Sequence, residues 1–378
     1  MKIALYGGAF NPVHSEHLNI VLAAKRALVL DKVIVIPTNI SPHKKGVMSA
    51  RGKDRLAMCR LAFEGVGGVE VSDVELKRGG VSYSYVTCRH FKKNYPSDDL
   101  FFIIGADMLK TFELWKEPDE ILKCATLAVC ARENADELSP YIKKFQKRFK
   151  KEIVNFGYVG KPVSSTRVRT LAALGEDTEG LVPESVRLYI RKRSLYGLEE
   201  LAGVKKYLTE ERWRHTVRVA LLAADYARAV GVYEIDAITA AALHDCAKFL
   251  SADAEELKGF VPPKGVPEPV LHQYSGAFVA EHTFGVKDEG VLNAIRYHTS
   301  GRENMSNLEK LIYLADLLEE GRDFDGVEEL RAKLKSGLDC CLLAALEHQL
   351  NYLKSKGEPV YPLTERAYRY MKEFYYDK

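Results

Sequence analysis

The chain has 378 residues, more than a single hydrophobic core usually supports, so two domains are expected. Its composition is typical of globular proteins, and a net charge of +3 is too small to indicate a nucleic-acid or membrane partner. The seven cysteines form no C-x-x-C pair, as is typical of free thiols in a reducing compartment. The N-terminal apolar run is too short for a signal peptide or spanning segment. We therefore expect a cytoplasmic protein of two domains.

The first half of the chain alternates short β-branched or aromatic runs with amphipathic stretches. The runs predict strands at residues 2–7, 31–38, 69–76, 100–107, 125–132 and 153–159, and the amphipathic stretches include predicted helices at 17–30 and 52–65. This alternation predicts an α/β domain with a doubly wound parallel sheet, which binds ligands at the carboxyl ends of its strands. The lysine-rich stretch 139–152 is typical of the solvated face of a surface helix.

Strand patterns end near residue 196. The rest of the chain is rich in Ala, Leu, Glu, Lys and Arg at helical spacing, with short Gly/Pro interruptions, which predicts an all-α domain. The junction lies near 189–197, where a helix that begins at Pro183 runs into a basic cluster and a glycine. We therefore expect domains at 1–195 and 196–378.

A phosphate-handling turn is predicted after the first strand, in "GGAFNPVHSEHL" (7–18). Gly7 and Gly8 allow the backbone to approach a ligand, and the helix that follows points its free N–H groups at the same place. The glycines do not form the dinucleotide pattern G-x-G-x-x-G. His14 and His17 share one face of the first helical turn, where two imidazoles can donate hydrogen bonds to phosphoryl oxygens. Taken alone, the pair is as often two surface histidines.

Other polar residues at strand ends favour the phosphate interpretation. Lys44 follows the second strand and Asp107 ends the fourth. Late in the domain, "VSSTRVR" places hydroxyls at a predicted helix N-terminus and an arginine one turn inside, a second cradle for an anion. Its residues are Ser164, Ser165, Thr166 and Arg169.

The order of these motifs resembles bacterial nicotinate-nucleotide adenylyltransferases, members of the H-x-G-H nucleotidyltransferases, over essentially all of residues 1–195. The motifs are "GGAFNPVHSEHL", "SPHKK", "RLAMCRLA", "FIIGADML", "LWKEPDEI", "CARE", "VSSTRVR" and "LVPESVRLYIRKRSLY". The resemblance implies a Rossmann-like fold, Mg²⁺-dependent transfer of AMP from ATP to a mononucleotide, and catalytic roles for His14 and His17. It implies that the ATP and substrate contacts include Gly7, Gly8, Phe10, Lys44, Asp107, Trp115 near the nicotinate ring, Arg132, Ser164, Ser165, Thr166 and Arg169.

Three positions depart from the family pattern. Glu16 replaces the glycine of H-x-G-H, Asn11 replaces an aspartate, and Val86 replaces an acid in "SYSYVT". Glu16 adds negative charge beside a predicted phosphate site, so we expect its side chain to point outward along the helix.

The second half contains six potential metal ligands in helical patterns. They are His215, His244, Asp245, His272, His298 and Asp316. Imidazole with carboxylate suits Fe, Mn, Zn or Co rather than Ca. Such a site lowers the pKa of a bound water and clamps a phosphate ester. Lys248 lies on the same helical face as Asp245, where both could meet one phosphate.

This spacing resembles the HD phosphohydrolase superfamily and, over about residues 200–360, the HD-type symmetrical bis(5'-nucleosyl)-tetraphosphatases. The motifs are "RWRHTVRVA", "ALHDCAKF", "LHQYSGAFVAEHTFGV" and the block that begins at Leu292. The resemblance implies a binuclear, iron-type centre held by the six residues, Asp245 and Lys248 as catalytic residues, and Lys248, Arg302 and Arg322 as phosphate contacts. It also implies hydrolysis of diadenosine tetraphosphate to two ADP. Glu320 and Gly321 depart from the family's E-P-N-R.

The sequence thus predicts a bifunctional enzyme acting on ATP, nicotinate mononucleotide and diadenosine tetraphosphate, with no nucleic-acid or membrane partner; it leaves the oligomeric state open. Two alternatives remain at this stage. The first half could use another mononucleotide, pantetheine phosphate or a CTP donor. The HD domain could cleave another nucleotide, or bind one as a regulatory module.

Overall fold

The computed structural model describes residues 1–40, 46–131, 138–198, 201 and 203–376. The chain forms two units, which are treated separately below. The first comprises Met1–Lys45, Ser49–Arg169 and Thr178–Leu195, and the second Gly46–Met48, Thr170–Asp177 and Tyr196–Lys378. No helix among the described residues is long and apolar enough to cross a membrane.

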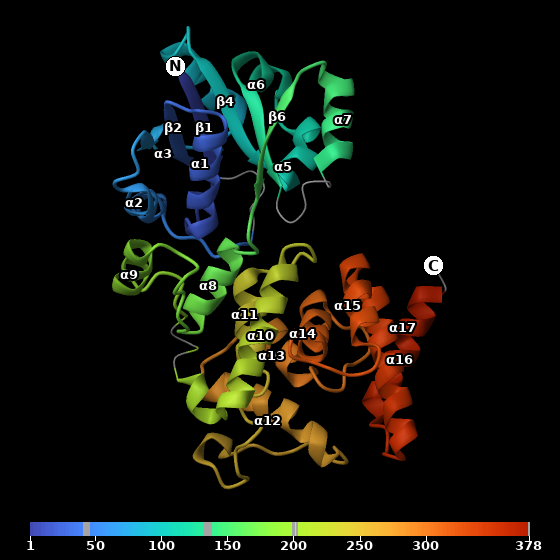
Figure 1. Ribbon diagram of the computed structural model, residues 1–378. Helices are drawn as coiled ribbons and strands as arrows, with labels where there is room; N and C mark the ends of the chain where they lie inside the picture. Colours follow the sequence, from blue (N-terminus) through green and yellow to red (C-terminus); the bar gives the residue numbers. More distant parts are fainter. Residues whose placement is uncertain (41–45, 132–137, 199–200, 202, 377–378) are drawn as a thin grey trace. The chain divides into compact units, whose positions relative to one another are not determined.

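The first unit is built on a six-stranded parallel sheet (Figure 1). Its strands are β1 (Lys2–Gly8), β2 (Lys32–Pro37), β3 (Val69–Val71), β4 (Asp99–Gly105), β5 (Thr126–Ala131) and β6 (Ile153–Val159). The strand order is β3-β2-β1-β4-β5-β6, so strands are added on one side of β1 up to β3 and on the other side from β4 onward. Ligands bind in the crevice at such a switch in strand order, which here is flanked by the segments that follow Gly8 and Gly105. The predicted doubly wound parallel sheet is confirmed.

Helices connect and cover these strands. They are α1 (Ser15–Ala27), α2 (Gly52–Phe63), α3 (Val74–Arg78), α4 (Ser84–Asn94), α5 (Ala106–Lys110), α6 (Pro118–Cys124), α7 (Leu138–Phe149), α8 (Ser165–Ala173) and α9 (Glu184–Lys192), with a 3₁₀ turn, η1, at Phe112–Leu114. The predicted strand 69–76 is wrong in its second half, because β3 ends at Val71 and α3 follows. There Glu75 is buried and accepts a hydrogen bond from Thr87 of α4, a tertiary contact that local alternation does not reveal.

The second unit is all-α in its described residues, as predicted. Its helices are α10 (Glu210–Ala227), α11 (Glu234–Leu243), α12 (Glu268–His282), α13 (Glu289–Arg296), α14 (Asn307–Leu318), α15 (Val327–Ser336), α16 (Leu338–Lys356) and α17 (Pro362–Tyr376), with 3₁₀ turns η4 (Val204–Tyr207) and η5 (Glu255–Leu257). Alanines fill the α10 and α11 core: Ala220, Ala223, Ala224, Ala227, Ala237, Ala240, Ala241 and Ala242 are at most 5% exposed.

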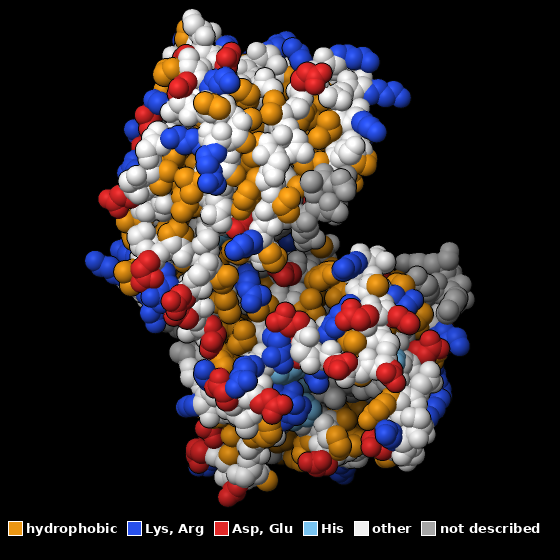
Figure 2. All heavy atoms as spheres, in the orientation of Figure 1, with side chains coloured by type: hydrophobic (Ala, Val, Ile, Leu, Met, Phe, Trp, Pro, Cys, Tyr) orange, Lys and Arg blue, Asp and Glu red, His pale blue; other side chains and the backbone are white. Residues whose placement is uncertain are grey.

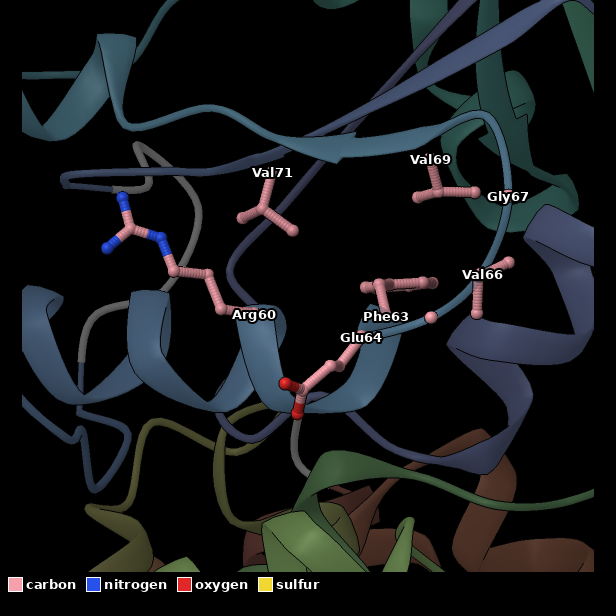
Figure 3. Close-up of a pocket in the computed structure, with 8 residues that line it drawn as sticks. Arg60, Phe63, Glu64, Val66, Gly67, Val69 and Val71 are labelled. Carbon is pink, nitrogen blue, oxygen red and sulfur yellow. The ribbon is translucent and has the colours of Figure 1, made fainter.

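A cavity of about 530 Å³ opens beside β3, where Arg60, Phe63, Val69 and Val71 line it with the glycine-rich turn that follows α2 (Figure 3). None of the residues predicted to bind nucleotide or metal lines this cavity. The candidate sites lie elsewhere, at the β1–α1 turn of the first unit and among the buried histidines of the second.

Candidate functional site

Two buried arginines fix the backbone of the turn between β1 and α1. Arg55 of α2 donates from Nη1 to the Ala9 carbonyl and from Nη2 to the Thr38 carbonyl, each at 2.6 Å. Arg169 of α8 donates from Nη1 to the Asn11 carbonyl, also at 2.6 Å. Both side chains are almost completely buried, so the carbonyls and guanidinium groups satisfy one another away from water. The turn is therefore held from two helices distant in sequence. The sequence analysis singled out Arg169 but missed Arg55.

His14 and His17 lie together at the start of α1. His14 occupies the N-cap position, and its backbone N–H donates to Nδ1 of His17 at 3.1 Å. This bond explains the three-residue spacing, since a side chain at the third helical position can reach back to the N-cap amide. It also places the proton of a neutral His17 ring on Nε2, which makes that atom a donor. The two rings are 3.7 Å apart between centroids.

Gly8 and Phe10 shape the same turn. A Cβ at Gly8 would lie 3.0 Å from the Phe10 ring, whereas one at Gly7 would meet nothing closer than 3.9 Å. Phe10 is buried and packs edge-on against His17, with centroids 4.9 Å apart. In this structure Gly8 therefore makes room for Phe10, and Phe10 supports the His17 ring.

The "VSSTRVR" segment packs against the turn from the other side. The Ser164 hydroxyl accepts a hydrogen bond from the Arg167 amide and so caps α8. The Ser165 hydroxyl donates a hydrogen bond to the Pro12 carbonyl at 3.0 Å. Arg169 also donates to Thr166 Oγ1. The α8 N-terminus, which can bind an anion, is thus attached directly to the turn that carries the two histidines.

Other predicted residues of the first unit are distributed around the ends of the strands. Asp107 is exposed in the first turn of α5, directly after β4. Trp115 is half-buried and packs on Phe102 and Phe112. Lys44 and Arg132 lie outside the described residues.

Glu16 does not point outward, and that expectation is wrong. Its carboxylate is buried and accepts hydrogen bonds from the Tyr158 hydroxyl and the Lys161 amide, both at 2.8 Å, and from Asn19 at 2.9 Å. Burial by itself would raise the pKa of Glu16, but these hydrogen bonds together lower it. The charge beside the predicted phosphate site is therefore used to join α1 to β6 and the segment that leads into α8.

Replacing Glu16 should loosen this junction. Glu16→Ala leaves the Tyr158 hydroxyl and the Lys161 amide without their acceptor, which should lower the local free energy of unfolding by about 2–4 kcal/mol. Hydrogen exchange of peptides from α1 and from residues 153–166 measures the effect. Tyr158→Phe removes one of the bonds and should give a smaller increase in exchange. Unchanged exchange in Glu16→Ala would contradict the role of Glu16 as a joint.

The six predicted metal ligands of the second unit converge from separate helices. His215 lies on α10, His272 on α12 and Asp316 on α14, while His244 and Asp245 directly follow α11. The cluster distances are short: His215 Nε2 is 2.9 Å from Asp316 Oδ1, and Asp245 Oδ1 is 3.3 Å from His272 Nε2 and 3.7 Å from His298 Nε2. Histidine side chains reach the surface of this unit among basic and acidic side chains (Figure 2).

The donor atoms fit a metal. Two triads, His215 with His244 and Asp316, and His244 with Asp245 and His298, bring their ligand atoms within 4.8 Å of one another. Nε2 of His215 and Nε2 of His244 are buried and lie 2.9 Å from Asp316 Oδ1 and 3.2 Å from Asp245 Oδ2, but neither makes a hydrogen bond of good geometry. This arrangement costs free energy unless another group satisfies these atoms. Nδ1 of His244 and Nδ1 of His298 contact main-chain carbonyls at 2.6 and 2.8 Å, which leaves Nε2 as the coordinating atom.

The carboxylates of the cluster are held in their charged form. Burial would raise the pKa of Asp245, but the charge of His244 and hydrogen bonds from three histidines place it well below its usual range. Burial would likewise raise the pKa of Asp316, and His215, His244 and Arg322 together lower it. A concentration of buried anionic and imidazole ligands favours a divalent cation.

The predicted phosphate-binding side chains fall into two groups. Lys248 contacts Asp245 at 3.2 Å and Arg322 contacts Asp316 at 2.7 Å, so both border the cluster. Arg302 instead pairs with the buried Glu309 at the start of α14. The structure adds Arg212, which the sequence analysis missed and whose Nη1 lies 3.0 Å from Asp245 Oδ2.

Glu319 is a second residue that the sequence analysis missed. It is 1% exposed, and its Oε1 lies 3.0 Å from His215 Nδ1. Burial would raise the pKa of Glu319, but bonds from His215, Arg218 and the Gly321 amide lower it to about 2. A carboxylate on the far nitrogen of a ligating histidine fixes the orientation and tautomer of its ring. Glu319 is placed to do this for His215.

Glu319→Gln should weaken metal binding. It removes one of the oxygens shared by His215 and Arg218, and loss of such a partner typically lowers metal affinity by about 10- to 100-fold. Competition with a chelator, followed by metal analysis of the intact chain, measures this affinity. Glu320→Gln changes the exposed neighbour and serves as the matched control. Equal affinities of Glu319→Gln and the parent would rule out the orienting role.

Comparisons with known proteins match this two-part organisation. Residues 5–171 match the cytidylyltransferase-like family and residues 212–321 the HD domain family. The probable nicotinate-nucleotide adenylyltransferase/Ap4A hydrolase of Mycoplasma genitalium is 32% identical over 93% of this chain and 99% of that protein. A probable nicotinate-nucleotide adenylyltransferase of Clostridium tetani is 38% identical over 52% of this chain and 98% of that protein. A symmetrical bis(5'-nucleosyl)-tetraphosphatase of Halalkalibacterium halodurans is 39% identical over 44% of this chain and 91% of that protein. The chain belongs to the family of two-domain nicotinate-nucleotide adenylyltransferase/Ap4A hydrolases.

Proposed function

We propose that the chain is a bifunctional enzyme with two chemically independent sites. Residues 1–195 transfer an adenylyl group from ATP to nicotinate mononucleotide, giving nicotinate adenine dinucleotide and pyrophosphate. Residues 196–378 hydrolyse diadenosine tetraphosphate symmetrically to two ADP. The observation that carries this proposal is that one relative matches across both units in the same order, and it is supported by side chains in each unit that suit the reaction proposed for it.

In the first unit, hydrogen-bond donors act directly on phosphate. The Nε2–H of His17 and the adjacent His14 ring stabilise negative charge on the phosphoryl oxygens as the pyrophosphate leaves, and no covalent intermediate is required. Arg55 and Arg169 hold the turn in position without an assigned ligand contact. Lys44, Asp107, Trp115 and Arg132 are proposed to contact ATP or the mononucleotide. Mg²⁺, when bound, would neutralise charge on the triphosphate.

In the second unit, the phosphate would be bound by a metal centre. The six residues of the cluster would hold a binuclear transition-metal centre, for which we propose iron, and such a centre would activate water and polarise the phosphate. Glu319 orients His215, and Lys248 and Arg322 supply positive charge at the edge of the cluster. The seven free cysteines agree with the proposed cytoplasmic location.

The two activities should separate by mutation. His244→Ala together with Asp245→Ala should reduce diadenosine tetraphosphate hydrolysis by at least about 100-fold while adenylyl transfer continues, because the histidine and aspartate belong only to the cluster. His14→Ala together with His17→Ala should show the opposite pattern. The assays supply ATP with nicotinate mononucleotide, or diadenosine tetraphosphate with Fe²⁺ or Mn²⁺, and products are separated by chromatography. Loss of both activities in a folded chain carrying either double substitution would contradict independent sites.

A further inference from the structure

A second cavity, of about 260 Å³, adjoins the histidine–aspartate cluster. Its lining includes His215 of the cluster, Glu319 that orients it, and residues from α10, from the segment after α11 and from the segment after α14. This volume is near the lower end for small-molecule sites, roughly 300–1,000 Å³. It therefore suits one half of a dinucleoside polyphosphate better than the whole molecule.

Three guanidinium groups line this cavity: those of Arg212, Arg218 and Arg322. Each is anchored by a carboxylate, Arg212 by Asp245 and Arg322 by Asp316. A guanidinium has five N–H donors, more than one carboxylate accepts, so donors remain that can serve a phosphate. The lining also includes the carboxylates of Glu211 and Glu319. The three guanidinium groups outnumber them, and beside a cluster that is proposed to cleave phosphate esters they favour a polyanionic ligand.

Gly321 leaves room for the guanidinium group of Arg218 at the cavity. A Cβ at position 321 would lie 2.5 Å from Arg218 Nη2 and 2.6 Å from its Cζ. Arg218 uses this space to bind Glu319 through Nε and Nη2. A side chain at position 321, such as the asparagine of the E-P-N-R pattern, would force the guanidinium end of Arg218 to shift. Gly321 therefore lets Arg218 keep this position in the cavity lining.

An aromatic ring is also exposed at the cavity. Phe249, four residues after Asp245, is 54% exposed and contributes to the lining. An exposed phenylalanine next to several guanidinium groups offers an apolar face on which a nucleic-acid base can stack.

We infer that this cavity binds one nucleoside diphosphate half of the substrate, with the base stacked on Phe249 and the phosphates on Arg212, Arg218 and Arg322. The inference rests on the proposed hydrolysis and adds the contacts that recognise the nucleoside. It distinguishes two kinds of residue: Phe249 recognises the base, whereas Arg218 recognises only phosphate.

Steady-state hydrolysis of diadenosine tetraphosphate by the full-length chain, at fixed free Mn²⁺, tests this division. Phe249→Ala should raise KM and the inhibition constant of ADP by about 10- to 100-fold, as expected for loss of one stacked base. The inhibition constant of tripolyphosphate, which has no base, should stay within about twofold of the parent because the guanidinium groups remain. Phe249→Tyr keeps the ring and should restore both KM and ADP inhibition.

Two further variants complete the comparison. Arg218→Ala should raise the inhibition constants of ADP and of tripolyphosphate by similar factors. Tyr352→Ala removes an equally exposed aromatic side chain that does not line the cavity, and it should change neither inhibition constant. The inference is overturned if Phe249→Ala leaves the inhibition constant of ADP unchanged, or raises that of tripolyphosphate as much as that of ADP.

Absence of hydrolysis in the parent would instead contradict the proposed function. The inference would then be decided by calorimetric titration of ADP into the chain carrying His14→Ala and His17→Ala, with and without Phe249→Ala. Weaker ADP binding in the Phe249→Ala chain would support the inference that the cavity binds the nucleoside, and equal ADP binding would overturn that inference.

Discussion

Both sites depend on charged side chains that are buried and held in place by oppositely charged or carbonyl partners. In the first unit, Arg55 and Arg169 bind main-chain carbonyls and thereby fix the turn that carries the histidines. In the second, Asp245 is 1% exposed and is surrounded by imidazole and guanidinium groups. Burial without such partners would cost several kcal/mol. These pairs therefore determine the positions of the reactive groups.

In the proposed function the two halves of the chain handle phosphate by different physical means. The first presents N–H donors from a helix start and two imidazoles, which would act at hydrogen-bond distance. The second concentrates carboxylates and imidazoles whose collective charge favours a cation, so that phosphate would be attracted indirectly. Histidine serves both designs because one ring nitrogen can be fixed by the backbone while the other stays available.

The sequence predicts those features that have a local pattern. Hydrophobic runs located all six strands of the sheet, although the third is shorter than predicted. Helical spacing together with the HD resemblance selected six side chains that the fold brings together. Residues whose importance depends on a distant partner were missed. Arg55 lies 46 residues from the carbonyl of Ala9 that it binds, and Glu319 lies 104 residues from His215. Neither has a local signature, and the inward orientation of Glu16 likewise depends on Tyr158, 142 residues away.

The alanines between α10 and α11 also have a consequence for the metal cluster. Helices that meet through small side chains can approach closely, and in this unit the His215 and His244 rings, carried by α10 and the end of α11, are 5.4 Å apart. The spacing of these two rings therefore depends on the alanines between the helices, one of which, Ala241, also contacts His244 through its carbonyl. Enlarging one of these methyl groups would separate the helices and widen the gap between the rings, so the geometry of the proposed metal site depends on the apolar interior as well as on the side chains of the cluster.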